Sequence, residues 1–188
     1  MNYGFIRISA SSLKLKVADV SFNVSMIKEA IDKALEMGVK LLVTPELSVT
    51  GYTCADLFFT DVIIKKSEKA VSIIADYIKE KDIVVVLGAP VAFYNKIYNC
   101  AVVLDNSGVK GIVPKKHLAN YNEFYEKRWF SSAEDLTEKS ILSSELGFAE
   151  NYEIPVGTDI IFKTVGFTFG AEICEDLWAP VSPSSFLA

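Results

Sequence analysis

The sequence predicts a mixed α/β fold in one domain that spans residues 1–188. Two patterns indicate this class: strand-like apolar runs alternate with amphipathic helices in the first half of the chain, and strands joined by short turns follow in the second half. The composition, 51% hydrophobic and 23% charged, is typical of a globular protein with a packed core. We therefore expect a mixed sheet with helices on its outer face.

The first half of the chain has a rhythm of strand, helix and strand. The predicted elements are a strand at 3–9, a helix at 22–38, a strand at 39–46, a helix at 61–81 and a strand at 82–90. Apolar residues recur at helical spacing in both helices, and the first helix ends at Gly38, a common terminator. The strand at 39–46 carries Glu46 at its end.

Antiparallel pairs are expected in the second half. Residues 96–116 form a predicted hairpin, because two apolar strands flank the turn sequence DNSG. Residues 117–153 lack a clean period and indicate a loop region with one helical segment in YNEFYEKRWF. The runs at 158–164 and 165–174 predict a final hairpin that ends at Cys174.

The segment after Cys174, EDLWAPVSPSSFLA, is a Pro- and Ser-rich loop. A covered sheet needs further elements to close it. We therefore expect the fold to be truncated at its C-terminal end.

Charge and hydropathy exclude several classes of protein. The net charge is −5, and the 19 basic residues are scattered among 24 acidic ones, so no basic patch for nucleic acid is present. No apolar run approaches the roughly 18 residues that span a bilayer, and the N-terminus lacks the pattern of a signal peptide. We expect a cytoplasmic protein with no nucleic-acid or membrane partner, acting on a small polar molecule.

The cysteines indicate neither a disulfide framework nor a metal site. Cys54, Cys100 and Cys174 are odd in number and widely spaced. The sequence also contains no zinc, P-loop or dinucleotide motif, so no metal ligand is predicted. One cysteine is therefore available for chemistry.

Cys174 has the most suggestive position of the three. It lies where the apolar run FTFGAEIC ends, and a nucleophile on a sharp turn there leaves the next backbone N–H free to face an oxyanion. The acids that follow, Glu175 and Asp176, would raise the pKa of the thiol, so a cation must offset them. The alternative is a buried structural cysteine.

Lys115 and Glu46 are candidates for the charged partners of this thiol. Lys115 lies in GIVPKKHL, where the ordinary alternative is a solvated lysine beside Lys116. Glu46 follows a proline at the end of an apolar strand, in a turn that would leave it partly buried; the alternative is an ordinary strand-end carboxylate.

Together these segments resemble the nitrilase superfamily of carbon–nitrogen hydrolases, which use a Glu, Lys, Cys triad in that chain order. The segment PELSVTGY resembles the glutamate block with Glu46, PKKHLANYNEFYEKRWF the lysine block with Lys115, and GAEICEDLW the cysteine block with Cys174. The resemblance covers nearly the whole chain. It implies a nitrilase-like four-layer α-β-β-α sandwich with mixed sheets.

The residues that flank the blocks resemble one subgroup, the amide-hydrolysing domain at the N-terminus of glutamine-dependent NAD synthetases. That resemblance implies hydrolysis of glutamine to glutamate and ammonia, and an NAD synthetase domain, absent from this chain, as the partner that uses the ammonia. Two alternatives stay open: a stand-alone hydrolase of another small amide, nitrile or carbamoyl compound, and a catalytically silent docking module.

The resemblance also implies catalytic roles. Cys174 would attack the amide carbon, Glu46 would act as general base and acid, and Lys115 with the backbone N–H of Glu175 would stabilise the oxyanion. Glu126, in EKRWF, would orient Lys115 and the substrate. Its alternative is a helix-face carboxylate paired with a nearby arginine.

Candidate substrate-binding residues come from the same blocks. They are Tyr121, Phe124 and Glu175, with Glu175 meeting the α-ammonium group of glutamine; the two aromatic residues could instead only pack the loop. His117, the single histidine, is interpreted as a packing or hydrogen-bonding residue and not as a base.

Amide hydrolysis by this route needs no cofactor, and ATP and Mg²⁺ would belong to the synthetase domain. The resemblance further implies a homo-oligomer.

Overall fold

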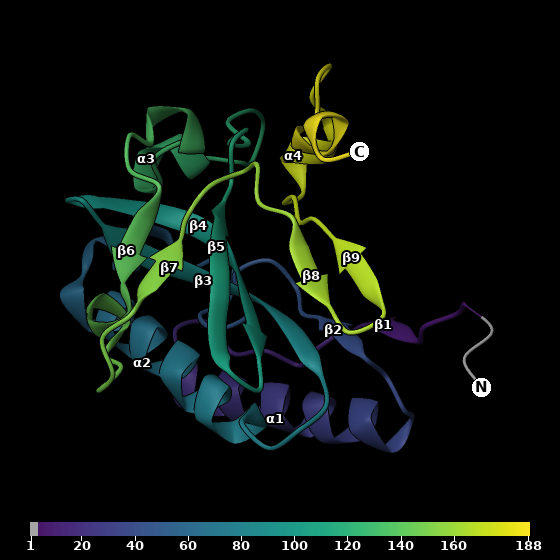
Figure 1. The fold of residues 1–188 in the computed structure, drawn as a ribbon. Helices are drawn as coiled ribbons and strands as arrows, with labels where there is room; N and C mark the ends of the chain where they lie inside the picture. The colour runs from purple at the N-terminus through teal and green to yellow at the C-terminus, as the bar shows by residue number, and fades with distance from the viewer. Residues whose placement is uncertain (1–3) are drawn as a thin grey trace.

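A five-stranded mixed sheet forms the centre of the structure, a computed structural model that describes residues 4–188 (Figure 1). The strands, in sheet order, are β1 (Ile8–Ala10), β2 (Leu41–Val43), β3 (Val84–Phe93), β4 (Lys96–Asp105) and β5 (Gly108–Pro114). The first three strands are parallel, and β3, β4 and β5 are antiparallel. The predicted mixed α/β class is confirmed.

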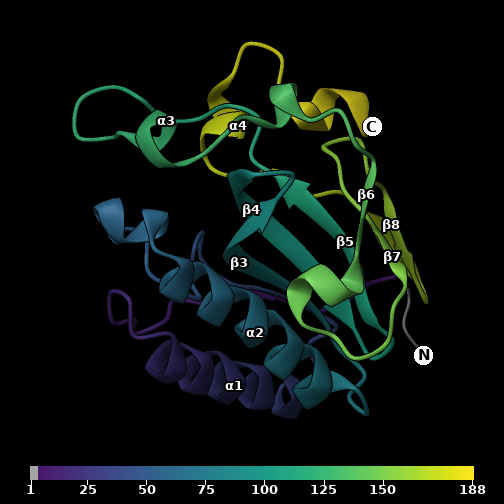
Figure 2. The same ribbon diagram turned by 90° about the vertical axis from the view of Figure 1, so that its left-hand side faces the viewer.

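Two long helices cover one face of this sheet, as Figure 2 shows. They are α1 (Val20–Glu36) and α2 (Asp61–Ile78), each connecting parallel strands. Ile27, Ile31 and Ile74 are fully buried in the core between the helices and the sheet. The carboxylate of Asp19 caps α1 by accepting the Phe22 N–H, which satisfies one of the free donors of the first turn.

A small hairpin packs on the opposite face. Its strands are β8 (Phe162–Thr164) and β9 (Phe167–Phe169). Phe162 packs with Val103 and Val113 of the sheet, and its ring stacks on Phe169 at a centroid distance of 5.3 Å. Residues 4–188 therefore supply three layers of the expected sandwich: helices, central sheet and a second strand layer.

The long connection after β5 contains short elements. They are α3 (Glu126–Trp129), β6 (Ser140–Leu142), β7 (Glu153–Pro155) and α4 (Glu175–Trp178), with 3₁₀ turns η2 (Ala133–Asp135), η3 (Ser143–Leu146) and η4 (Pro183–Phe186). A further 3₁₀ turn, η1 (Ala55–Phe59), lies earlier in the chain, between β2 and α2. The helical segment predicted in YNEFYEKRWF is confirmed as α3. The β6–β7 pair was not predicted, because strands of three residues carry too little alternation to be recognised.

The last predicted strand was too long. It was expected to end at Cys174, but β9 ends at Phe169 and 170–173 are irregular. The N–H of Ile173 bonds the side chain of Asp176 and not a neighbouring strand, so the ladder cannot continue.

Among the described residues, no helix is both long enough and apolar enough to cross a membrane.

Candidate active site

The three residues of the predicted triad each lie next to the end of a strand or helix. Glu46 follows β2, Lys115 follows β5, and Cys174 directly precedes α4. In Figure 1, α3 and α4 lie over the same end of the central sheet. Residues widely separated in the sequence thus meet at one edge of the fold.

The side chains of Glu46, Lys115, Glu126 and Cys174 form a cluster, and the buried Lys115 is its centre. The side chain of Lys115 has no exposed surface, and its Nζ donates to Glu46 Oε1 at 2.7 Å and to Glu126 Oε1 at 2.8 Å. Burial lowers the pKa of this lysine, but the two carboxylates outweigh that effect and raise it above its ordinary value. Lys115 is therefore a charged ammonium, and the solvated alternative is wrong.

Glu126 is held by several donors. Only 1% of its side chain is exposed, and besides the lysine it accepts hydrogen bonds from the Tyr52 hydroxyl at 2.6 Å and the Ala119 N–H at 3.1 Å. Arg128 bonds Asp56 at 2.7 and 2.8 Å. The alternative in which Glu126 pairs with an arginine of its helix is not the observed arrangement.

The backbone around Glu46 is unusually close to the sheet. A Cβ on Gly88 of β3 would lie 2.2 Å from the carbonyl oxygen of Pro45 and 2.7 Å from the Leu47 nitrogen, so only glycine fits. Leu47 has a φ of 52°, a left-handed conformation that costs energy for a residue with a branched side chain. The strained turn aims the Glu46 carboxylate at Lys115.

Cys174 has the geometry of a nucleophile on a sharp turn. Its φ is 47° and its ψ is −98°, and it precedes the first residue of α4. Among residues 4–188, the backbone N–H of Glu175 has no protein acceptor. Cys174 is exposed, whereas Cys54 and Cys100 are buried. The thiol therefore faces solvent with a free donor beside it.

The surroundings of Cys174 favour the protonated form of its thiol. Desolvation of the sulfur and the nearby charge of Glu46 raise the pKa of Cys174, and the ammonium of Lys115 lowers it. The charge of Glu126 raises the pKa further. The carboxylates that govern this thiol are thus Glu46 and Glu126, whereas the sequence had pointed to Glu175 and Asp176.

Asp176 has a different role from the one expected. Its side chain is 1% exposed and accepts the backbone N–H groups of His117 at 2.6 Å, Lys116 at 3.2 Å and Ile173 at 3.2 Å. Burial raises the pKa of this carboxyl, and those amide donors oppose the shift. Through these hydrogen bonds, Asp176 connects the turn that contains Cys174 to the segment that follows Lys115.

Tyr121 contacts both of the other candidate substrate-binding residues, Glu175 and Phe124. The hydroxyl of Tyr121 donates to Glu175 Oε2 at 2.8 Å, a hydrogen bond that raises the pKa of the tyrosine. The rings of Tyr121 and Phe124 are 5.7 Å apart, edge to face. Half of Tyr121 is exposed, so the pair borders the open side of the cluster.

His117 takes no part in the cluster through its side chain. Its backbone N–H bonds Asp176, and its ring atom Nε2 is buried without a hydrogen-bond partner among the described residues.

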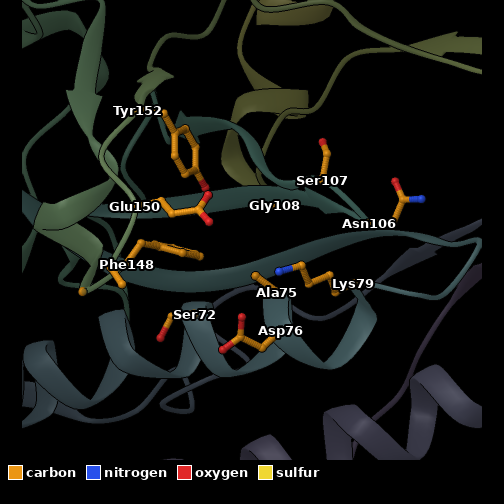
Figure 3. A pocket seen from close by; sticks show the side chains of 12 residues that line it. Ser72, Ala75, Asp76, Lys79, Asn106, Ser107, Gly108, Phe148, Glu150 and Tyr152 are labelled. Carbon is orange, nitrogen blue, oxygen red and sulfur yellow. The ribbon is translucent and has the colours of Figure 1, made fainter.

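A separate cavity of about 310 Å³ lies at the other end of β5 (Figure 3). It is bordered by α2 residues such as Ser72 and Asp76, the β4–β5 turn at Ser107, and the segment that carries Phe148 and Tyr152. None of the candidate catalytic residues lines it.

The cluster combines groups suited to acyl transfer. An open thiol lies near the Glu46 carboxylate, and an ammonium and a free N–H can both stabilise a developing negative charge. Such a constellation is chemically able to attack a carbonyl carbon through sulfur.

Three contributing residues were not predicted from the sequence. They are Tyr52, Asn99 and Asp176, which bond Glu126, Glu46 and the backbone around Lys116. Asn99 had a recognisable signal, because it is the single amide in the apolar strand KIYNCAVVL. Tyr52 had only its place at the end of the segment PELSVTGY, and its contact with Glu126 depends on how the loop folds.

A family model described as carbon–nitrogen hydrolase matches residues 7–184. The glutamine-dependent NAD(+) synthetase of Mycobacterium tuberculosis is 31% identical over 186 residues, which is 97% of this chain and 26% of that protein. The human glutamine-dependent NAD(+) synthetase is 30% identical over 95% of this chain and 26% of its own length. The chain thus spans about a quarter of the length of these relatives.

Solved structures agree with this family. A glutamine-dependent NAD(+) synthetase from Cytophaga hutchinsonii is 33% identical with a TM-score of 0.76, over 90% of this chain and 28% of that one. An amidase from Nesterenkonia sp. has a TM-score of 0.71 at 20% identity, over 93% of this chain and 57% of that one, a likeness of fold.

Proposed function

This chain belongs to the carbon–nitrogen hydrolase family, and on that premise we propose that it hydrolyses the side-chain amide of glutamine to glutamate and ammonia. The observation that carries the proposal is the buried Lys115, which joins Glu46 and Glu126 beside the open thiol of Cys174. The names of the relatives support glutamine as the nitrogen donor.

The reaction begins with proton transfer from a neutral thiol. Glu46 takes the proton of Cys174 as the sulfur attacks the amide carbon, so a thiolate need not accumulate although the pKa of the thiol is raised. The carbonyl oxygen becomes an oxyanion. The Lys115 ammonium and the N–H of Glu175 stabilise it, because both donors are in place before the charge develops.

Collapse of the tetrahedral intermediate releases ammonia. Glu46 gives its proton to the amide nitrogen, the carbon–nitrogen bond breaks, and a thioester on Cys174 remains. Glu46 then removes a proton from water as the water oxygen attacks the thioester. The sulfur leaves, recovers a proton, and glutamate is released.

The α-amino end of glutamine would bind at the solvent-exposed side of the cluster, where Tyr121 and Glu175 lie. The carboxylate of Glu175 meets the α-ammonium group of glutamine, and Tyr121 holds that carboxylate in place through its hydrogen bond. Phe124 packs between Tyr121 and Tyr52, with ring centroids 5.7 and 6.2 Å away. It forms the apolar wall beside the methylene groups of the substrate.

The proposal extends to the partner that uses the ammonia. By analogy with the named relatives, an NAD synthetase domain receives it, and ATP and Mg²⁺ serve that domain, whereas the hydrolytic steps need no cofactor. The cytoplasmic location and the homo-oligomer remain predictions.

Ammonia release from glutamine tests the proposal. We expect the purified protein to release ammonia from glutamine, and a Cys174→Ala variant to release none. Faster hydrolysis of other ω-amides or of N-carbamoyl compounds than of glutamine would instead identify a stand-alone amidase. Absence of turnover on every amide would favour a docking module.

A further inference from the structure

We propose that Asn99 is a positioning residue, which holds the Glu46 carboxylate so that one of its oxygens stays free to accept the thiol proton. The inference rests on the proposed function and adds a residue outside the three motif blocks.

Asn99 reaches the cluster from the sheet. It lies on β4, has no exposed surface, and donates from Nδ2 to Glu46 Oε1 at 2.6 Å. Its backbone oxygen accepts the Lys115 N–H at 2.8 Å, which places the two residues side by side across the β4–β5 pair. The amide therefore acts from a strand that is hydrogen-bonded to a neighbour on each side, β3 and β5.

Both nitrogen donors that reach Glu46 contact the same oxygen. Lys115 Nζ lies 2.7 Å from Oε1, the atom that also accepts from Asn99. Within residues 4–188, no nitrogen donates to Oε2 of Glu46. Two donors on one oxygen fix the rotation of the carboxyl group and leave Oε2 unoccupied for the proton of Cys174.

The amide oxygen of Asn99 gives a second indication. Oδ1 is buried and has no hydrogen-bond partner among the described residues. An unsatisfied buried acceptor costs stability, and the neighbours on the same face of β4, Ala101 and Val103, are apolar. Turning the amide over would set Oδ1 against a carboxylate, so the charge of Glu46 dictates its orientation. The amide therefore fits a role at Glu46 better than a role in packing.

Two variants remove the donor. Asn99→Leu keeps about the size of the side chain and Asn99→Ala truncates it, so either can be used if the other fails to fold. We measure glutamine hydrolysis and the rate at which a glutamine-like chloroketone labels Cys174. We expect kcat and the maximal labelling rate to fall about 10- to 100-fold, because a misplaced base slows proton transfer. KM and the half-saturating concentration of the label should change by less than about threefold.

A core truncation on the same strand is the control. Val102 is fully buried on the helix-facing side of β4, so Val102→Ala lowers stability and leaves kcat and labelling at wild-type values. The inference is overturned if Val102→Ala slows labelling as much as the Asn99 variants do. It is also overturned if the Asn99 variants keep wild-type rates, or if only their KM rises.

The two proposals can fail separately. A wild-type protein that neither hydrolyses glutamine nor is labelled at Cys174 contradicts the proposed function, and the role of Asn99 with it. Normal labelling of the wild type together with equally fast labelling of the Asn99 variants contradicts the positioning role alone.

Discussion

Lys115 neutralises the buried carboxylate of Glu126 and the partly buried carboxylate of Glu46, so its removal should affect stability as well as chemistry. Lys115→Met keeps the length of the side chain and leaves Glu46 and Glu126 without their shared cation. We expect a loss of about 3–5 kcal/mol in the free energy of unfolding, as for other broken buried pairs. We also expect kcat to fall about 10²- to 10³-fold, because one oxyanion donor is lost.

The adjacent lysine is the matched control for this change. Lys116 is partly exposed and lies 3.9 Å from Glu134, so Lys116→Met should change stability by less than about 0.5 kcal/mol. Chemical denaturation and initial rates measure both effects. Equal behaviour of the two variants would contradict a special role of Lys115.

The pKa of Cys174 predicts opposite effects of one substitution on reactivity and on turnover. The charge of Glu46 raises the pKa of the thiol, so Glu46→Gln should lower it. More thiolate is then present at neutral pH, and alkylation by iodoacetamide should become about 3- to 10-fold faster, with its pH profile moved to lower pH. Glutamine hydrolysis should be lost, because glutamine cannot carry the proton.

Glu80 is an exposed carboxylate on a different part of the chain, so Glu80→Gln serves as the reference for the alkylation rates. A profile of Glu46→Gln that moves to higher pH would show that the carboxylate does not oppose the thiolate.

The residues that carry the chemistry could be named from the sequence, but some of their contacts could not. Glu46, Lys115, Glu126 and Cys174 lie in recognisable blocks, and their grouping follows from the resemblance. The hydrogen bond of Asn99 to Glu46 depends on which strands pair, which the sequence leaves open. A candidate site is therefore more predictable than the residues that orient it.

At the scale of elements, the fit of the Glu46 turn against β3 explains a glycine in an apolar strand. Gly88→Ala would set a methyl group 2.2 Å from the oxygen of Pro45, and backbone atoms cannot turn aside as a side chain can. We expect a loss of about 1–3 kcal/mol in the free energy of unfolding. Because the turn that carries Glu46 must move away from the sheet, kcat should fall as well.

Gly157→Ala is the control, since the atom closest to its Cβ would be the end of the Asp159 side chain, at 2.7 Å, and the next nearest atoms beyond its chain neighbours also belong to side chains. Thermal unfolding and glutamine hydrolysis of the two variants should differ clearly. A Gly88→Ala variant with wild-type stability and activity would contradict the close approach.

Long elements were predicted well because their patterns extend over many residues. The periodicity of α1 and α2 and the apolar runs of β3, β4 and β5 identified these elements, with boundaries shifted by a few residues. The final strand was overestimated because its apolar residues continue beyond Phe169, although the backbone there bonds a side chain. The composition of a segment cannot reveal that a side chain will take a backbone N–H away from a neighbouring strand.

At the scale of the whole molecule, Asp176 connects segments that are 60 residues apart. Asp176→Ala would leave the N–H groups of Lys116, His117 and Ile173 without their acceptor, and we expect a loss of about 2–4 kcal/mol in the free energy of unfolding. Labelling of Cys174 should slow, because the turn of the cysteine is no longer held beside Lys115.

Asp176→Asn retains one acceptor oxygen and should lose less of both properties. Urea unfolding together with labelling rates compares the two variants. If Asp176→Ala is as stable and as quickly labelled as the wild type, the connection does not hold the site together.

The central claim is that Cys174 forms a thioester with the side-chain acyl group of glutamine. The most direct measurement mixes the protein with isotopically labelled glutamine, quenches the reaction in acid within milliseconds, and maps the labelled peptide by mass spectrometry. The account predicts a glutamyl group on Cys174 that appears before free glutamate and is absent from Cys54 and Cys100. Release of glutamate with no acyl group on Cys174 at any time, or an acyl group on another residue, would contradict it.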